Sequence, residues 1–582
     1  MKAHLLLFAV GIVAFTPSLA HGQGILTPPG APGPTMKSLD QVEPRTPISS
    51  VPYAINTSGS YYLTGNLTVN SGIAISINAG GVTLDLNGFT ISSTASSPNA
   101  AAILIGSGLS KISILNGSIE GGATVSGGTW SGGNFSDGIL FAGATPKNVR
   151  VSGVRLNGFV GSGIYLSSDH SSVVESCVVQ AAQVYGIGAP VVRNSTAVSC
   201  GLNGIVADEV SDSFGSSVVS GGNGISGTYS VINCGGSAVS GYGIVVYPGA
   251  VENSYGESSS GTGISGYAVQ NCSAASNTGT ALNGNSITNC YATNNSTSNA
   301  TITGTSVRGC YAVQTGSGPC ITAGDVADCT AASQFSGASN ATLIFAKTVS
   351  NASAQAPNAT GATGINASVV QNSSATVTGD TSLGIAAQLS GSNCYSIVMA
   401  GSGTALQGPQ LLNCYASTGG GIAILGENIM NCFATAGPGG TGLEANAGLG
   451  NISHCMVAMG NGGTGINVAG GVVENCVIVS AATAISVGSS CVIKGNNFNG
   501  NTNGIVVSGS ANRIESNNGS CPVNGQAYII NGTHNLIIGN SARDNGINQF
   551  SIVGAANSFG AIVNVSAGGT IGTSDPRANL VY

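Results

Sequence analysis

The feature that most constrains the fold is a repeat of about 20 residues that runs from Val174 to Ala542. Its unit is clearest at Val473–Ile478, which reads apolar, polar, Asn, Cys, any residue, then small or apolar. When the units are aligned on the Cys position, called the anchor below, successive anchors are 18 to 23 residues apart. The anchors are Cys177, Ser195, Ser213, Cys234, Ser254, Cys272, Cys290, Cys310, Cys329, Ala352, Ser373, Cys394, Cys414, Cys432, Cys455, Cys476, Asn496, Asn517 and Asn540.

Two marks within the repeat predict its structure. The residue three places before the anchor is Val, Ile or Leu in every unit except the one with Gly391, and the residue directly before the anchor is most often Asn. Midway between anchors comes a small or polar residue, then Gly or Ala, then Ile or Leu, as in 203–205. Short apolar runs at this period, without a helical pattern, predict an all-β solenoid of stacked parallel coils.

The coils must stack because one coil cannot bury its own apolar residues. We expect roughly 22 to 25 coils of about 20 residues in a single solenoid, with strands of neighbouring coils about 4.8 Å apart. The Asn before the anchor suits a left-handed or bridge-region bend, which Asn tolerates better than most residues. Stacked in a column, these Asn side chains can form hydrogen bonds from coil to coil.

The two ends of the chain depart from the repeat. Residues 1–20 combine Lys2, a short apolar run and a small-x-small site, which predicts a signal peptide and hence a secreted or cell-surface protein. No apolar run reaches membrane-spanning length, so we expect no membrane span. Residues 21–52 are rich in Pro and predict a linker or clasp, residues 53–565 the solenoid, and residues 566–582 a cap over its last edge.

Composition narrows the possible partners. Only 6% of residues are charged while 42% are hydrophobic, and disordered chains show the opposite balance. The net charge is −7 with only 14 Lys and Arg, and no basic stripe is present, which argues against nucleic acid and anionic membrane surfaces. We expect a monomer.

The fifteen cysteines suggest disulfides in an exported chain. Most of them, however, occupy the anchor column, where Ser, Ala or Asn replace them. Parallel side chains on neighbouring coils keep Cβ atoms near 4.8 Å apart, beyond the usual disulfide range of about 3.5–4.5 Å. The pattern therefore favours buried free thiols. Cys320, Cys491 and Cys521 lie off the column, and their state stays open. No Cys/His spacing is typical of zinc, so no metal site is expected.

Charged residues and His are concentrated between Asp137 and Asp212, with eleven in those 76 residues against eleven in the next 280. The charged residues that lie two positions before an anchor, such as Glu175 and Arg193, should face solvent and form only weak ion pairs. The catalytic candidates that remain are Lys147, Arg150, Arg155, Asp169, His170, Asp208 and Glu209. A polysaccharide hydrolase needs carboxylates for acid–base chemistry, and a lyase can use Ca²⁺ with a basic residue. The alternative is a polar loop surface without catalysis and without a cofactor.

Aromatic residues recur directly after the anchor. This position should face outward, since the anchor and the residue two places after it are small. The glycan-binding candidates here are Tyr291 and Tyr311, which fall on adjacent coils, and Tyr395, Tyr415 and Phe433, which fall on three coils in succession. An exposed aromatic stripe suits a glycan chain lying along the rod. The alternative is a stacked ladder that stabilises the sheet.

Both ends of the chain resemble a known family. The segments Pro28–Lys37, Leu39–Arg45 and Gly59–Leu67, the Val-x-Asn-Cys coils, and Ile562–Val565 with Asp575–Leu580 are similar to secreted bacterial right-handed parallel β-helix proteins. The resemblance implies the right-handed, pectin-lyase-like fold. It implies no activity, because that superfamily contains lyases, hydrolases and non-catalytic proteins.

Two functions stay open from the sequence. The first is an exported non-catalytic protein that binds glycan or another surface of the cell envelope, which low charge and regular coils favour. The second is a polysaccharide lyase or glycoside hydrolase that acts near residues 147–209, with Ca²⁺ possible for the lyase. It requires the charged candidates to converge in one groove.

Overall fold

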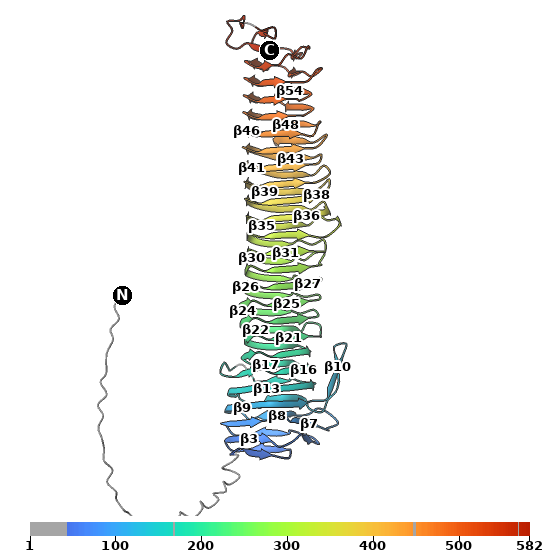
Figure 1. The fold of residues 1–582 in the computed structure, drawn as a ribbon, viewed down its shortest axis with the longest axis vertical. Coiled ribbons are helices and arrows are strands. Elements are labelled where there is room, and N and C mark those ends of the chain that lie inside the picture. Colours follow the sequence, from blue (N-terminus) through green and yellow to red (C-terminus); the bar gives the residue numbers. More distant parts are fainter. Residues whose placement is uncertain (1–43, 167–168, 446–447, 449, 569) are drawn as a thin grey trace, which may run out of the picture. The chain divides into compact units, whose positions relative to one another are not determined.

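The computed structural model describes residues 44–582 except 167–168, 446–447, 449 and 569. The chain divides into two units, Met1–Arg45 and Thr46–Tyr582, and every strand belongs to the second. The predicted signal peptide and most of the predicted linker lie outside the described residues. The second unit is all-β, without a helix in its described residues, and forms a single parallel β-solenoid of about 25 turns with roughly 21 residues per turn (Figure 1). The predicted solenoid is thus confirmed.

One sheet of 61 strands winds along this unit, and a two-stranded hairpin, β10 (Ala123–Ser126) with β11 (Thr129–Gly132), stands apart from it. The sheet starts at β1 (Thr46–Ile48), which pairs with β3 (Gly59–Leu63), and includes β63 (Asn579–Val581). Strands therefore occur within both segments that the sequence assigns to a linker and to a cap.

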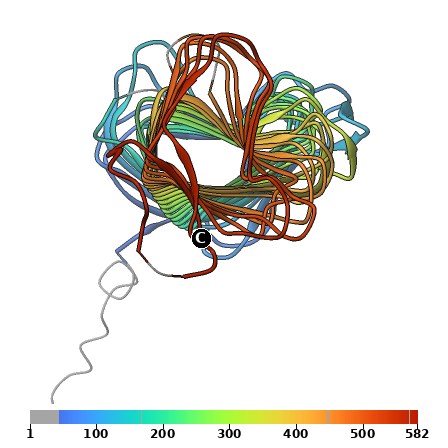
Figure 2. The same cartoon turned by 90° about the horizontal axis from the view of Figure 1, so that it is seen from above.

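Buried columns fill the interior of the coils. The midway Ile or Leu stacks in register from coil to coil, as Ile225, Ile244 and Ile264 do, and these side chains have no exposed surface. The Val, Ile or Leu before the anchor forms a second such column. Viewed from above, the coils superpose in a closed outline (Figure 2). Each apolar column is thus shielded from water only because a neighbouring coil covers it.

The turn before the anchor behaves as predicted. The residue directly before each anchor has a positive φ, for example 54° at Asn413 and 53° at Asn431. Several of these side chains are linked along the column, since Asn413 Nδ2 donates to Asn393 Oδ1 at 3.3 Å and Asn393 Nδ2 to Asn372 Oδ1 at 3.0 Å. The left-handed turn and its hydrogen-bonded column are both confirmed.

The anchor cysteines are buried free thiols, as predicted. Their sulfurs lie near the backbone carbonyl two residues earlier, as in Cys272 Sγ to Gln270 O at 3.1 Å. Cys320, Cys491 and Cys521, whose state the sequence left open, are also buried and free, and so is a fourth off-column cysteine, Cys200.

We expect the native thiols to be unreactive. All fifteen cysteines are buried, which keeps a reagent from their sulfurs, and burial also raises the pKa of Cys200 and Cys320 to about 12, so little of their reactive thiolate form exists at pH 8. A thiol-reactive dye added at that pH should label the folded protein far more slowly than the protein unfolded without reductant. The unfolded chain should then titrate for all fifteen cysteines. A count below fifteen in the unfolded chain would show that some cysteines form disulfides. Rapid labelling of the folded protein would show that some sulfurs are exposed.

The last coils replace the anchor Cys by buried Asn. Asn496 Nδ2 donates to Asn517 Oδ1 at 3.0 Å, and Asn517 Nδ2 donates to Asn540 Oδ1 at 3.0 Å. Asn540 Nδ2 donates in turn to Asn579 Oδ1 at 3.1 Å. These four residues are called the asparagine ladder below. Because Asn579 lies on β63, the chain end supplies the ladder's last rung.

Candidate functional site

The predicted charged cluster is divided by the winding of the coil. Arg150 and Arg155 both lie on β13 (Lys147–Phe159), but a left-handed residue, Gly153, turns the strand between them. Arg150 Nε donates to Glu175 Oε1 at 2.7 Å. Arg155 instead pairs in register with Val178, in the column that follows the anchor. The two arginines therefore face different sides of the solenoid.

Asp169 stabilises a turn. Its carboxylate accepts hydrogen bonds from the Ser171 hydroxyl and from the Ser171 backbone N–H at 3.0 Å, and these bonds lower the pKa of Asp169. Ser171 Oγ accepts from the backbone N–H of Asn148 at 2.6 Å. Lys147, next to Asn148 at the start of β13, is exposed and lowers that pKa further as a nearby positive charge.

His170 and Asp208 are the two candidates that the structure brings together. Nδ1 of His170 lies 3.0 Å from Oδ2 of Asp208, and the side chains are 67% and 17% exposed. The backbone N–H groups of Asp208 and Glu209 both donate to Pro190 O. Asp208 and Pro190 also line a depression of about 220 Å³, together with Tyr165, Gly188, Ala189, Val206, Ala207 and Thr228. Glu209 is exposed and pairs in register with Val191.

The aromatic candidates form ladders whose rings lie against one another. Tyr291 and Tyr311 stack with centroids 5.7 Å apart and planes 8° from parallel. Tyr395, Tyr415 and Phe433 form a run of three, at 4.7 Å and 5.4 Å. Mutual stacking covers at least one face of each ring, while Tyr291, Tyr311 and Tyr395 remain 45%, 43% and 45% exposed. The geometry matches the ladder that stabilises the sheet.

A second aromatic set was missed from the sequence. Tyr229, Tyr247 and Tyr267, called the tyrosine row below, lie on successive strands β22 (Asn223–Ile232), β24 (Ile244–Glu252) and β26 (Ile264–Gln270) (Figure 1). They are 54%, 77% and 53% exposed. Gly227, Val246 and Gly266 pair in register, and the tyrosine of each strand comes one or two residues after them.

The rings of the row are free of mutual stacking. Among the described residues, neither Tyr247 nor Tyr267 stacks on another ring, and Tyr229 has a tilted contact at 5.9 Å with His170. Tyr247 and Tyr267 come three residues after the midway Ile, and Tyr229 four. That offset from Ile is the signal that would have found the row.

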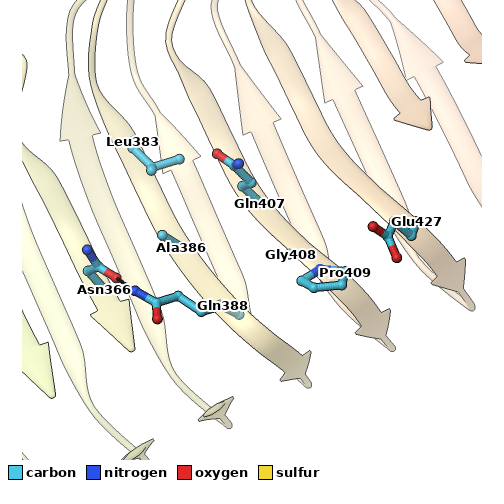
Figure 3. A pocket seen from close by; sticks show the side chains of 9 residues that line it. Asn366, Leu383, Ala386, Gln388, Gln407, Gly408, Pro409 and Glu427 are labelled. Carbon is cyan, nitrogen blue, oxygen red and sulfur yellow. Dashed lines mark hydrogen bonds between the residues drawn. The ribbon is translucent and has the colours of Figure 1, made fainter. Parts of the chain in front are cut away.

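A groove occupies the same side of later coils. It measures about 470 Å³ and is called the amide groove; it is lined by Asn366, Leu383, Ala386, Ala387, Gln388, Gln407, Gly408, Pro409 and Glu427. Figure 3 shows the amides of Gln388 and Asn366 pointing toward each other, with Gln388 Nε2 donating to Asn366 Oδ1 at 3.0 Å. Continuous register links these coils to the tyrosine row.

The chain shows little similarity to known proteins. No family model and no curated protein matches the chain. Among solved structures, the chain is similar to the A-module of the mannuronan C-5 epimerase AlgE6 of Azotobacter vinelandii, at 12% identity and a TM-score of 0.17, over 76% of this chain and 91% of that one. So low a TM-score carries no argument about function.

The described residues lack two further features. They hold no group of three or more His, Cys, Asp or Glu placed to bind a metal ion. Nor does this part of the chain contain a helix that is long and apolar enough to cross a membrane.

Proposed function

We propose that the protein is an exported, non-catalytic β-solenoid that binds glycan on the side that carries the tyrosine row. The observation that supports this is three exposed tyrosines on successive coils with ring faces free of mutual stacking. The C–H faces of sugar rings pack on aromatic faces, and tyrosine offers such contact area at a low cost in side-chain entropy. We also propose the right-handed, pectin-lyase-like winding that the sequence resemblance implies.

Binding rather than catalysis is favoured by the chemistry near Asp208. A glycoside hydrolase places two carboxyl groups on either side of the bond that it cleaves. Asp208 contacts the imidazole of His170. The nearby Asp169 carboxylate is hydrogen-bonded to Ser171, and Arg155 belongs to another side of the coil. The His170–Asp208 pair beside its depression is what supports the lyase or hydrolase alternative.

A polysaccharide panel tests the proposal. The full chain would be scored for retention on each polysaccharide and for new reducing or unsaturated ends, with and without Ca²⁺. We expect retention on at least one polysaccharide, no new ends and no dependence on Ca²⁺. New ends that disappear in H170A or D208N would establish the catalytic alternative. Absence of binding across the panel would refute glycan binding.

A further inference from the structure

The surface around the tyrosine row has an unusual charge balance. The sequence contains no Lys or Arg between Arg193 and Arg308, a stretch that includes the whole row. On the side of the coils where the tyrosines lie, the exposed residues on the coils that follow the row carry hydroxyl or amide groups. Beyond Tyr267 these are Asn283 and Asn285 on β28 (Leu282–Thr288) and Thr305 on β30 (Ile302–Arg308).

Three of the acidic residues of this stretch lie elsewhere on the coils. Glu257 lies in the strand after the anchor, where it accepts hydrogen bonds from Tyr255 Oη at 2.7 Å and Ser237 Oγ at 3.0 Å. Asp212 sits in the turn column and accepts from Asn233 Nδ2 at 3.1 Å. Glu252 ends β24, beyond the buried Val251. At one end the row meets His170 with Asp208, and the exposed Glu209, which pairs in register with Ser230 next to Tyr229.

The nearest cation that shares the tyrosines' position on the coil is distant. Lys347 follows Ala346, which stands in the register of Gly266 four coils further along. Four coils correspond to about 19 Å. This exceeds twice the Debye length of about 8 Å at physiological ionic strength, so Lys347 is screened from a ligand on the row. Arg308 is closer but lies within 3.7 Å of the Asp328 carboxylate on the turn side.

We propose that the ligand of the tyrosine row is an uncharged polysaccharide. This inference rests on the proposed glycan binding and narrows it to one chemical class. A polyuronate carries a carboxylate on each sugar and would lie on aromatic faces, whose electron-rich centres repel anions, without a cation to compensate. A polyamine ligand would find no row of carboxylates along the tyrosine row to pair with its positive charges. Hydroxyl and amide groups beside aromatic faces complement sugars that carry only hydroxyl groups or N-acetyl groups.

The test compares ligand charge at two ionic strengths. The full chain would be titrated with uncharged probes (soluble cellulose, mannan, β-1,3-glucan and chitin oligomers), with polygalacturonate and alginate, and with chitosan. Ionic strengths of about 0.01 M and 1 M change the Debye length from about 30 Å to about 3 Å. We expect one or more uncharged probes to bind at least about tenfold more tightly than the charged ones, with less than about a twofold change between the two conditions.

A charge insertion supplies the matched variant. N285K/T305K places two cations beside the row at exposed positions. It should raise polyuronate binding at low salt, and this gain should largely disappear at high salt. Tighter binding of a polyuronate or of chitosan by the wild type would overturn the inference while leaving glycan binding intact. No binding to any probe would overturn both.

Discussion

Replacement of Asn517 by leucine is expected to lower the free energy of unfolding of the C-terminal coils by about 3–5 kcal/mol. Asn517 is 1% exposed and stands in the middle of the asparagine ladder. Its Oδ1 accepts from the backbone N–H of Asn496 at 2.9 Å, and its Nδ2 donates to Ile493 O at 2.9 Å. Leucine would remove both partners without giving the buried N–H or carbonyl another. Each buried polar group left unpaired costs about 1–3 kcal/mol.

Two other substitutions distinguish the loss of the ladder's hydrogen bonds from a general effect of replacing an asparagine. Asn497 is the exposed neighbour of Asn496, and N497L should change stability by less than about 0.5 kcal/mol. N517S should lose less than N517L, because an anchor serine accepts the same backbone bond elsewhere, as Ser195 Oγ does from Cys177 N at 3.2 Å. Hydrogen exchange should place the loss in the last coils, since each coil contacts only its neighbours. Equal losses in N517L and N497L would contradict the role of the ladder.

The repeat made most of the fold predictable. The spacing of the anchors predicted the coils, and the residue before each anchor predicted the left-handed turn. The small residues at the anchor and two places after it predicted that the aromatic residue between them faces outward. All three are local consequences of one chain path repeated in register, so sequence alignment was sufficient. Asn413 and Cys432 occupy the positions that their places in the repeat predict.

The candidate site was harder because it lies where the repeat is irregular. Between paired residues of β22, β24 and β26, the number of intervening residues changes from two (228–229) to three (247–249) to one, Tyr267. Alignment on the anchors therefore displaces Tyr247, which lies seven residues before its anchor, from Tyr229 and Tyr267, which lie five before theirs. The charged candidates show the opposite case: Arg150 and Arg155 are close in sequence, but the turn at Gly153 sends them to different sides.

The second large effect is expected on binding. Y247A/Y267A should weaken binding of the best uncharged polysaccharide at least about 30-fold, because each exposed aromatic anchor is expected to contribute more than about 1 kcal/mol. Both side chains are at least half exposed, so their removal should leave the free energy of unfolding nearly unchanged. Y247F/Y267F keeps the ring faces and should retain most of the affinity.

The stacked ladder provides the matched control. Y395A/Y415A removes two aromatic rings of the same kind, each of which has at least one face stacked on a neighbouring ring. It should lower stability by about 1–2 kcal/mol through lost ring contacts and leave glycan affinity unchanged. The measurement that tests the account most directly is therefore the affinity of one uncharged polysaccharide for the wild type and these two double variants, measured side by side. The account predicts loss of binding in Y247A/Y267A alone; loss in Y395A/Y415A with retention in Y247A/Y267A would contradict it.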